Sequence, residues 1–179
     1  MTPERWADLE ELFGPRGASG GCWCMWWRLK RSDFDAAKGD ANHDAFRRIV
    51  ENGEVPGLLL YVEGRPVGWC AVQPRERFAV LGRSRALRPI DDVDAWSVVC
   101  LYVHKAYRRT GVSVELLEAA AEHAMANGAE AVEGYPVEPK TGSMPAAFAW
   151  TGTVSAFRAA GYTEVGRGPT GRVIMRRAG

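Results

Sequence analysis

Arg108, Arg109 and Gly111 lie between a predicted strand and a predicted helix, where together they could bind an anion. Residues 96–103 form a nearly continuous apolar run rich in β-branched and aromatic residues, which is typical of a buried strand. The basic segment 104–109 and Gly111 follow, and from Val112 apolar residues recur at helical spacing until Asn127-Gly128. The unpaired N–H groups and the positive dipole end of such a helix attract phosphate. The sequence therefore predicts an anion site here.

The segment Arg108-x-x-Gly111-x-Ser113 resembles the Q/R-x-x-G-x-G/A signature of the GNAT superfamily of acyltransferases, which bind acetyl-CoA. The resemblance implies that this loop wraps the CoA pyrophosphate and that the preceding strand pairs its backbone with the pantetheine arm. Ser113 departs from the usual Gly or Ala, but it is small and can donate a hydrogen bond. The implied cofactor-binding residues are Leu101, Val103, Arg108, Arg109, Thr110, Gly111, Val112 and Ser113.

Acyl transfer from a thioester to an amine needs a donor that polarises the carbonyl, a base for the amine and an acid for the thiolate. Backbone N–H groups near Cys100 or Leu101, exposed where the central strands splay, could polarise the carbonyl. The resemblance places an acid at Phe157 and a base at Ser97, and neither side chain can fill the role.

Three other residues are candidates for these proton transfers. Glu133 and Tyr135 fall on one face of the predicted strand 129–137, which makes them the expected substitutes. His104 is a third candidate, because imidazole titrates near neutral pH. The predicted catalytic residues are therefore Glu133, Tyr135 and His104.

The segment 22–29 holds three tryptophans, two cysteines and a methionine. As a strand it would alternate these side chains between two faces, and two interpretations stay open. It is either a core strand or an aromatic wall in which Trp23, Trp26 and Trp27 bind a flat, aromatic or cationic acceptor. The Cys22-x-Cys24 pair could ligate a metal, but it lacks a second pair at suitable spacing, so no metal site is predicted.

The length, charge and cysteine content of the chain limit the classes of protein to which it can belong. The 179 residues suit one domain spanning 1–179, and a net charge of +1 gives no reason to expect a nucleic acid or a membrane as partner. The polar, acidic start Met1–Arg5 does not resemble a signal peptide, and no apolar run approaches transmembrane length. The four cysteines lie mostly in apolar runs, which is typical of a reducing compartment. We therefore expect a cytoplasmic protein.

Periodicity and turn signals predict the remaining elements. They are a helix near 2–13, a polar link at 30–42, a helix ending at Asn52-Gly53, a hairpin of strands 57–61 and 66–72, a loop with a helical turn at 74–89, a loop at 139–145, a helix in the later part of 146–160, and a strand pair at 162–165 and 173–175. With the resemblance, these elements imply an α/β fold whose central sheet is mixed and mostly antiparallel, flanked by helices, with a splay between the two central strands.

The leading hypothesis is an N-acetyltransferase that moves an acetyl group directly from acetyl-CoA to the amine of a small-molecule acceptor in a ternary complex. Dimers are common in the family, so a homodimer is one expected assembly. Three alternatives remain open: a non-catalytic acyl-CoA-binding or sensing module, a protein lysine acetyltransferase, and a redox or metal protein built on Cys22-x-Cys24.

Overall fold

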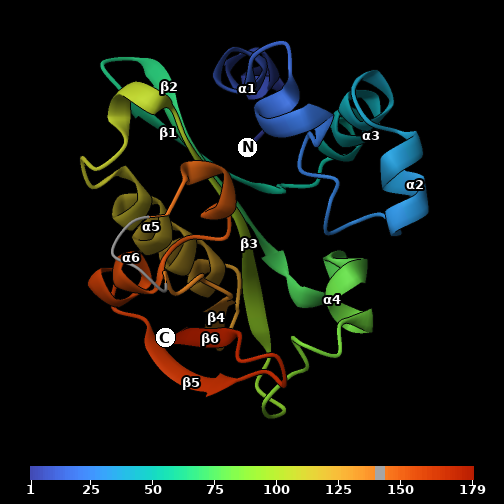
Figure 1. The fold of residues 1–179 in the computed structure, drawn as a ribbon. Helices are drawn as coiled ribbons and strands as arrows, with labels where there is room; N and C mark the ends of the chain where they lie inside the picture. The colour runs from blue at the N-terminus through green and yellow to red at the C-terminus, as the bar shows by residue number, and fades with distance from the viewer. Residues whose placement is uncertain (140–143) are drawn as a thin grey trace.

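The structure, a computed structural model, describes residues 1–139 and 144–179 and is built around a six-stranded sheet (Figure 1). The strand order is β1-β2-β3-β4-β6-β5. The strands are β1 (Gly57–Val62), β2 (Arg65–Pro74), β3 (Ala95–Val103), β4 (Ala131–Gly134), β5 (Thr163–Arg167) and β6 (Val173–Ala178). Neighbouring strands are antiparallel except β3 and β4, which run parallel. The predicted α/β fold with a mixed, mostly antiparallel sheet is confirmed.

Helices cover both faces of the sheet (Figure 1). One face carries α5 (Val112–Ala126) and α6 (Val154–Ala159). The other carries α1 (Trp6–Phe13), α2 (Arg31–Ala36), α3 (Asp40–Glu51) and α4 (Ala79–Arg83). Shorter helical turns lie at Pro3–Arg5, Gly17–Gly21, Arg75–Arg77, Lys105–Tyr107 and Ala146–Phe148. Because side chains alternate along a strand, each face of the sheet packs its own apolar cluster.

Most of the predicted elements form where local signals placed them. In the hairpin between β1 and β2, Glu63 and Gly64 have φ angles of 50° and 77°, the positive values that a tight hairpin turn requires. The central strand and the helix that begins at Val112 are confirmed. The strand predicted at 129–137 is shorter and ends at Gly134, before Pro136, which has no N–H for the ladder. Positions 140–143 of the predicted loop lie outside the described residues.

Two predictions for the N-terminal third are wrong. Segment 22–29 is not a strand, because Trp23 and Cys24 have φ angles of 40° and 55°, and Met25 N donates to Cys22 O in a turn. The polar link predicted at 30–42 contains α2, whose buried Phe34 anchors it to the N-terminal apolar cluster. The described residues contain no helix of the length and apolarity that crossing a membrane needs.

Candidate active site

The loop between β3 and α5 has the backbone geometry of an anion site. Arg109 and Gly111 have φ angles of 66° and 98°, and Gly111 immediately precedes the first residue of α5. A Cβ at Gly111 would meet only the Glu115 carboxylate, at 3.9 Å, so the space in front of the loop is open. The first N–H groups of α5 have no partner within the helix. The segment 108–113 therefore presents exposed arginines and free N–H donors to one region, as an anionic phosphate would require.

Packing against β2 fixes the position of this loop. A Cβ at Gly68 would lie 2.9 Å from side-chain atoms of both Val112 and Leu116, so glycine allows α5 to approach the sheet closely. Arg108 Nε donates to Val103 O at 3.2 Å, and Thr110 Oγ1 donates to Tyr107 O at 2.7 Å. Strand, loop and helix start therefore form one connected unit.

The two central strands separate after four residue pairs. β3 and β4 pair from Ala95 with Ala131 to Val98 with Gly134. Beyond Gly134 the returning chain lies between them: Leu101 N donates to Trp150 O at 2.7 Å, and Val137 N donates to Gly152 O at 2.9 Å. The splay expected in the sheet is present, but the Leu101 N–H is not exposed. The expectation of a free donor there is corrected, because residues 150–152 take the place left by the shortened β4.

Tryptophans surround the separated part of β3. Trp27 Nε1 donates to Val99 O at 3.0 Å, and the Trp27 and Trp150 rings lie 5.7 Å apart. Trp26 packs edge-on against both Trp150 and Phe34. The structure therefore brings two of the predicted acceptor residues to the splay, together with Trp150, which sequence reasoning missed.

Trp23 lies apart from this group. It is buried in the N-terminal apolar cluster, and its ring contacts those of Trp6, Phe13 and His43. For Trp23 the geometry favours the core interpretation of the segment.

A row of polar side chains crosses the sheet below the splay. Strand register aligns Gln73 with Ser97, Ser97 with Glu133, and Glu133 with Arg176, so all four side chains share the face that carries α4. Gln73, Ser97 and Glu133 are buried. Buried polar rows are costly unless hydrogen-bonded, which makes this row the best candidate for chemistry on that face.

Glu133 is only 4% exposed and is held by arginines. Its Oε1 accepts from Arg176 Nε at 3.1 Å and from Arg176 Nη2 at 2.7 Å, and Arg176 also binds Asp91 through both terminal nitrogens. Glu133 Oε2 lies 3.9 Å from Arg75 Nη1 and accepts no hydrogen bond from the described residues. Glu133, Asp91, Arg75 and Arg176 line an open pocket of about 630 Å³ beside α4, so water can reach this carboxylate.

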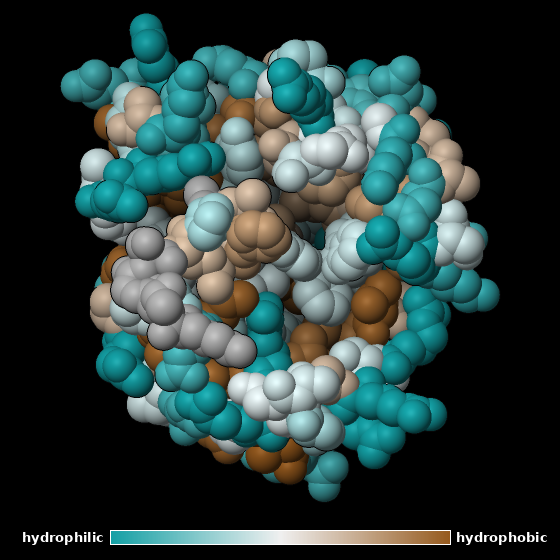
Figure 2. Space-filling model, viewed as in Figure 1, coloured by the Kyte–Doolittle hydropathy of each residue, from teal (hydrophilic) through white to brown (hydrophobic). Residues whose placement is uncertain are grey.

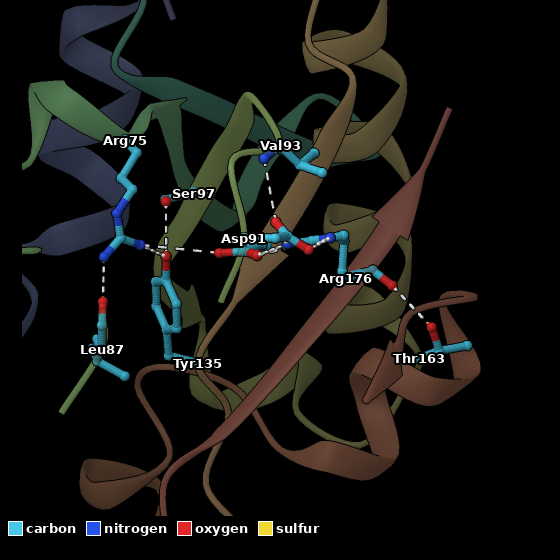
Figure 3. Close-up of polar contacts among 9 residues, drawn as sticks. Arg75, Leu87, Asp91, Val93, Ser97, Tyr135, Thr163 and Arg176 are labelled. Atoms are coloured by element: carbon cyan, nitrogen blue, oxygen red, sulfur yellow. Dashed lines mark hydrogen bonds and ion pairs between the residues drawn. The ribbon is translucent and has the colours of Figure 1, made fainter. Parts of the chain in front are cut away.

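Tyr135 is fully buried beside Glu133. Its hydroxyl lies 2.9 Å from Ser97 Oγ and accepts from Arg75, which also donates to Leu87 O (Figure 3). Burial, opposed by the Arg75 charge, raises the pKa of Tyr135 to about 12. The phenol is therefore neutral at physiological pH, and it is a far weaker acid than a thiol, whose ordinary pKa is about 8.5.

His104 lies outside this group. It follows the last residue of β3, and its Nδ1 accepts from Ala106 N at 3.4 Å. Seven residues separate it from Ser97, or roughly 23 Å along an extended strand. The structure therefore brings Glu133 and Tyr135 together and leaves His104 beside the loop.

The cysteines form neither a disulfide nor a recognisable metal site. All four are free, and Cys24 Sγ accepts from Trp69 Nε1 at 3.0 Å. Within residues 1–139 and 144–179, no three His, Cys, Asp or Glu side chains gather closely enough to hold a metal ion.

The site also contains residues that sequence reasoning missed. Gln73 and Arg176 complete the polar row, but their partners lie on other strands, and only the register reveals them. Arg75, in the helical turn after β2, joins the site through the Tyr135 hydroxyl. The side of the molecule drawn in Figure 2 is hollowed near its centre, with pale and brown residues around the hollow and many hydrophilic residues toward the edge.

Comparison with known proteins identifies the family. The sequence model of the Acetyltransferase (GNAT) family matches residues 23–144, more than half of the chain. No curated protein sequence matches significantly.

Solved structures share the fold at low identity. A GNAT-family acetyltransferase from Listeria monocytogenes is 12% identical, with a TM-score of 0.57 over 99% of this chain and 91% of that one. The aminoglycoside acetyltransferase AAC(6')-Ib, crystallised with coenzyme A and kanamycin, is 15% identical, with a TM-score of 0.55 over 99% and 91%. The PaiA N-acetyltransferase of Thermoplasma acidophilum, crystallised with coenzyme A, is 13% identical, with a TM-score of 0.53 over 100% and 96%. The chain belongs to the GNAT family of acetyltransferases, enzymes that use acetyl-CoA as co-substrate.

Proposed function

We propose that this protein is a cytoplasmic N-acetyltransferase that moves the acetyl group of acetyl-CoA directly to the amine of a small molecule. The observation that carries the proposal is the loop between β3 and α5, whose positive φ angles and open front suit a pyrophosphate. The buried polar row on the adjoining strands supplies groups for the transfer. The four free cysteines agree with a reducing compartment.

The loop would hold the cofactor by its phosphates. Arg108 and Arg109 supply positive charge, and the N–H groups of Gly111, Val112 and Ser113 supply donors at the helix start. Leu101 and Val103 would bind the pantetheine arm through their backbone. For Leu101 to do so, its N–H must leave Trp150 O, so residues 150–152 must shift when acetyl-CoA binds.

Glu133 is the proposed base. In the transfer, the N–C bond to the acetyl carbon forms and the C–S bond breaks, and one proton leaves the amine. Glu133 lies beside Ser97, about 13 Å along β3 from Leu101, so the proton would pass through water in the pocket to Oε2. The departing thiolate takes a proton from solvent, since Tyr135, with a pKa of about 12, is a poor donor to it. Tyr135 instead positions Ser97 and Arg75.

Trp26 and Trp27 are the proposed acceptor wall, beside the splay where the thioester would lie. Nothing in this group of side chains resembles a groove for a peptide, so a small-molecule amine is preferred over a protein lysine.

Calorimetric titration with acetyl-CoA tests the cofactor site. The parent should bind, and Gly111→Trp should not, because the large side chain would fill the open space in front of the loop. Gly128→Trp, at a solvent-facing glycine at the other end of α5, is the matched control and should bind like the parent. Absence of binding to the parent would refute the proposal.

Glu133→Gln tests the base. The amide keeps the shape of the side chain and should lower kcat by about 10²-fold or more, the usual contribution of a positioned base. Glu130→Gln, at an exposed position nearby, should leave kcat unchanged. A Glu133→Gln enzyme with parental kcat would remove Glu133 from the mechanism.

A non-catalytic acyl-CoA-binding module is the second candidate. The absence of the family's Tyr acid at Phe157 and of its Glu base at Ser97 favours it. Any turnover with an amine, detected as release of free CoA thiol, would exclude it.

A further inference from the structure

Arg28 is a half-buried cation without a carboxylate partner. It directly follows Trp26 and Trp27, and its guanidinium lies over the rings of Phe78 and Phe46, 4.9 and 5.9 Å from their centroids. Nη2 donates to Gln73 Oε1, and Nη1 reaches Arg77 O at 3.5 Å. Both acceptors are neutral oxygens. In the described part of the chain, Arg28 forms no ion pair, and its buried Nε has no hydrogen-bond partner.

Glu54 is the acidic residue whose charge acts on Arg28, but its carboxylate oxygens contact Gln73 and Arg77 instead. Glu54 Oε2 accepts from Gln73 Nε2 at 3.2 Å, and Glu54 Oε1 lies 3.6 Å from Arg77 Nη1. Burial lowers the pKa of Arg28, while the nearby Cys24 and Glu54 act in the opposite direction. A guanidinium has five N–H donors. On Arg28 two are used, the buried Nε–H has no partner, and two on the terminal nitrogens remain for another partner. A cation left in this state is costly unless an anion joins it.

The position of Arg28 connects this unpaired cation with the proposed site. Gln73, which Arg28 contacts, is aligned with Ser97 in the polar row, and Glu133 is the next residue along that row. Two strand spacings, about 10 Å, therefore separate Gln73 from Glu133. Trp27 fixes the same segment to Val99 at the splay. An acceptor lying against Trp26 and Trp27 would have the thioester on one side, and Arg28 is the next residue of the same segment.

We propose that Arg28 binds the carboxylate of the acceptor, and that the acceptors of this enzyme are amino acids or closely related amino carboxylates. The inference rests on the proposed N-acetyltransferase function and names the substrate class for the same site. A planar guanidinium fork suits a carboxylate, and charge-assisted hydrogen bonds of this kind are among the strongest in proteins.

Matched pairs of acceptors test the inference. The rate of CoA-thiol release is measured with phenylalanine against phenethylamine and with tryptophan against tryptamine, where each pair differs only in the carboxylate. In the parent, kcat/KM should be at least about tenfold higher for the amino acid. In Arg28→Gln this ratio should fall to about one. Arg47→Gln, which removes an exposed arginine paired with Glu51 on α3, should keep the parental ratio.

The ratio of kcat/KM within each pair distinguishes recognition of the carboxylate by Arg28 from a purely structural role of Arg28. If Arg28 only stabilised the fold, Arg28→Gln would slow both members of a pair alike and leave the ratio unchanged, which would overturn the inference. Equal or better use of the decarboxylated amines by the parent would also overturn it. If Arg28→Gln does not fold, Arg28→Lys replaces it in the test. Lysine keeps the positive charge but lacks the planar pair of guanidinium donors, so this variant should lower the ratio in part.

Absence of turnover still gives a result. If acetyl-CoA binds but no acceptor reacts, N-acetylphenylalanine and N-acetylphenethylamine are titrated onto the CoA complex by calorimetry. Tighter binding of the carboxylate member, lost in Arg28→Gln, supports the inference, and equal binding or no binding of the two overturns it. If acetyl-CoA itself does not bind the parent, the proposed function fails, and that failure is distinguished by the cofactor titration alone.

Discussion

Replacing Trp150 by alanine is expected to tighten the binding of acetyl-CoA. In the structure, Trp150 O accepts the Leu101 N–H that the pantetheine arm would need, so residues 150–152 and the cofactor compete for one strand edge. The Trp150 ring holds the segment in place by packing on Trp27 and Trp26, with ring centroids 5.7 and 6.2 Å away. The substitution removes this packing and leaves the backbone hydrogen bond possible.

The size of the effect follows from those two contacts. An aromatic pair contributes about 0.5–1.5 kcal/mol beyond the area it buries, so two pairs contribute about 1–3 kcal/mol to keeping the segment on β3. If acetyl-CoA binding breaks both pairs, their removal lowers Kd by about 5- to 150-fold. The free protein should lose a similar amount of stability, because it no longer gains from the same contacts.

Calorimetric titration of acetyl-CoA onto the parent and Trp150→Ala measures this directly, with urea unfolding of the free proteins alongside. Trp96→Ala is the control, because Trp96 packs on His123 at the opposite end of β3 and should change stability without changing Kd. An unchanged or weaker affinity of Trp150→Ala would show that the segment does not compete with the cofactor, and the reasoning from the Leu101 hydrogen bond would fail.

Two further predictions concern stability. The pKa of Tyr135 is about 12 in the folded protein and about 10 in the unfolded chain, so its contribution to stability is complete below pH 10 and is lost as the pH rises to 12, by up to about 2.7 kcal/mol. The free energy of unfolding of the parent, measured in urea, should therefore fall more between pH 10 and 12 than that of Tyr135→Phe. Parallel falls in the two proteins would contradict the assigned pKa. A Cβ on Gly134 would lie 2.1 Å from the Phe157 ring, so Gly134→Ala should cost about 1–3 kcal/mol of unfolding free energy. Gly82→Ala, whose Cβ would meet nothing within 4 Å, should cost nothing, and equal losses in the two variants would refute the packing argument.

Much of the site could be predicted from the sequence because its signals are local. The apolar run of β3, the glycine at the start of α5 and the helical period after Val112 are all contained in one short stretch. Glu133 and Tyr135 were predicted on one face by strand alternation alone, and the structure places both on the face that carries α4.

The segment 22–29 could not be predicted in this way. Its aromatic and apolar composition is typical of a strand, but Trp23 and Cys24 adopt positive φ angles because contacts with remote elements hold them there. Local pattern carries no information on such contacts. The same holds for Phe34, a single apolar residue in a polar stretch that packs in the core as part of a helix.

The sequence by itself determined most of the elements, the position of the loop between β3 and α5 and the resemblance to an acetyltransferase, since each depends on neighbouring residues. Only the tertiary structure decided which polar residues meet. Gln73, Ser97, Glu133 and Arg176 come from four strands, and register alone aligns them. Only the tertiary structure, likewise, placed residues 150–152 on the free edge of β3 and left Arg28 without a carboxylate. Contacts between residues far apart in the chain depend on how whole strands pair, and no short stretch of sequence specifies that pairing.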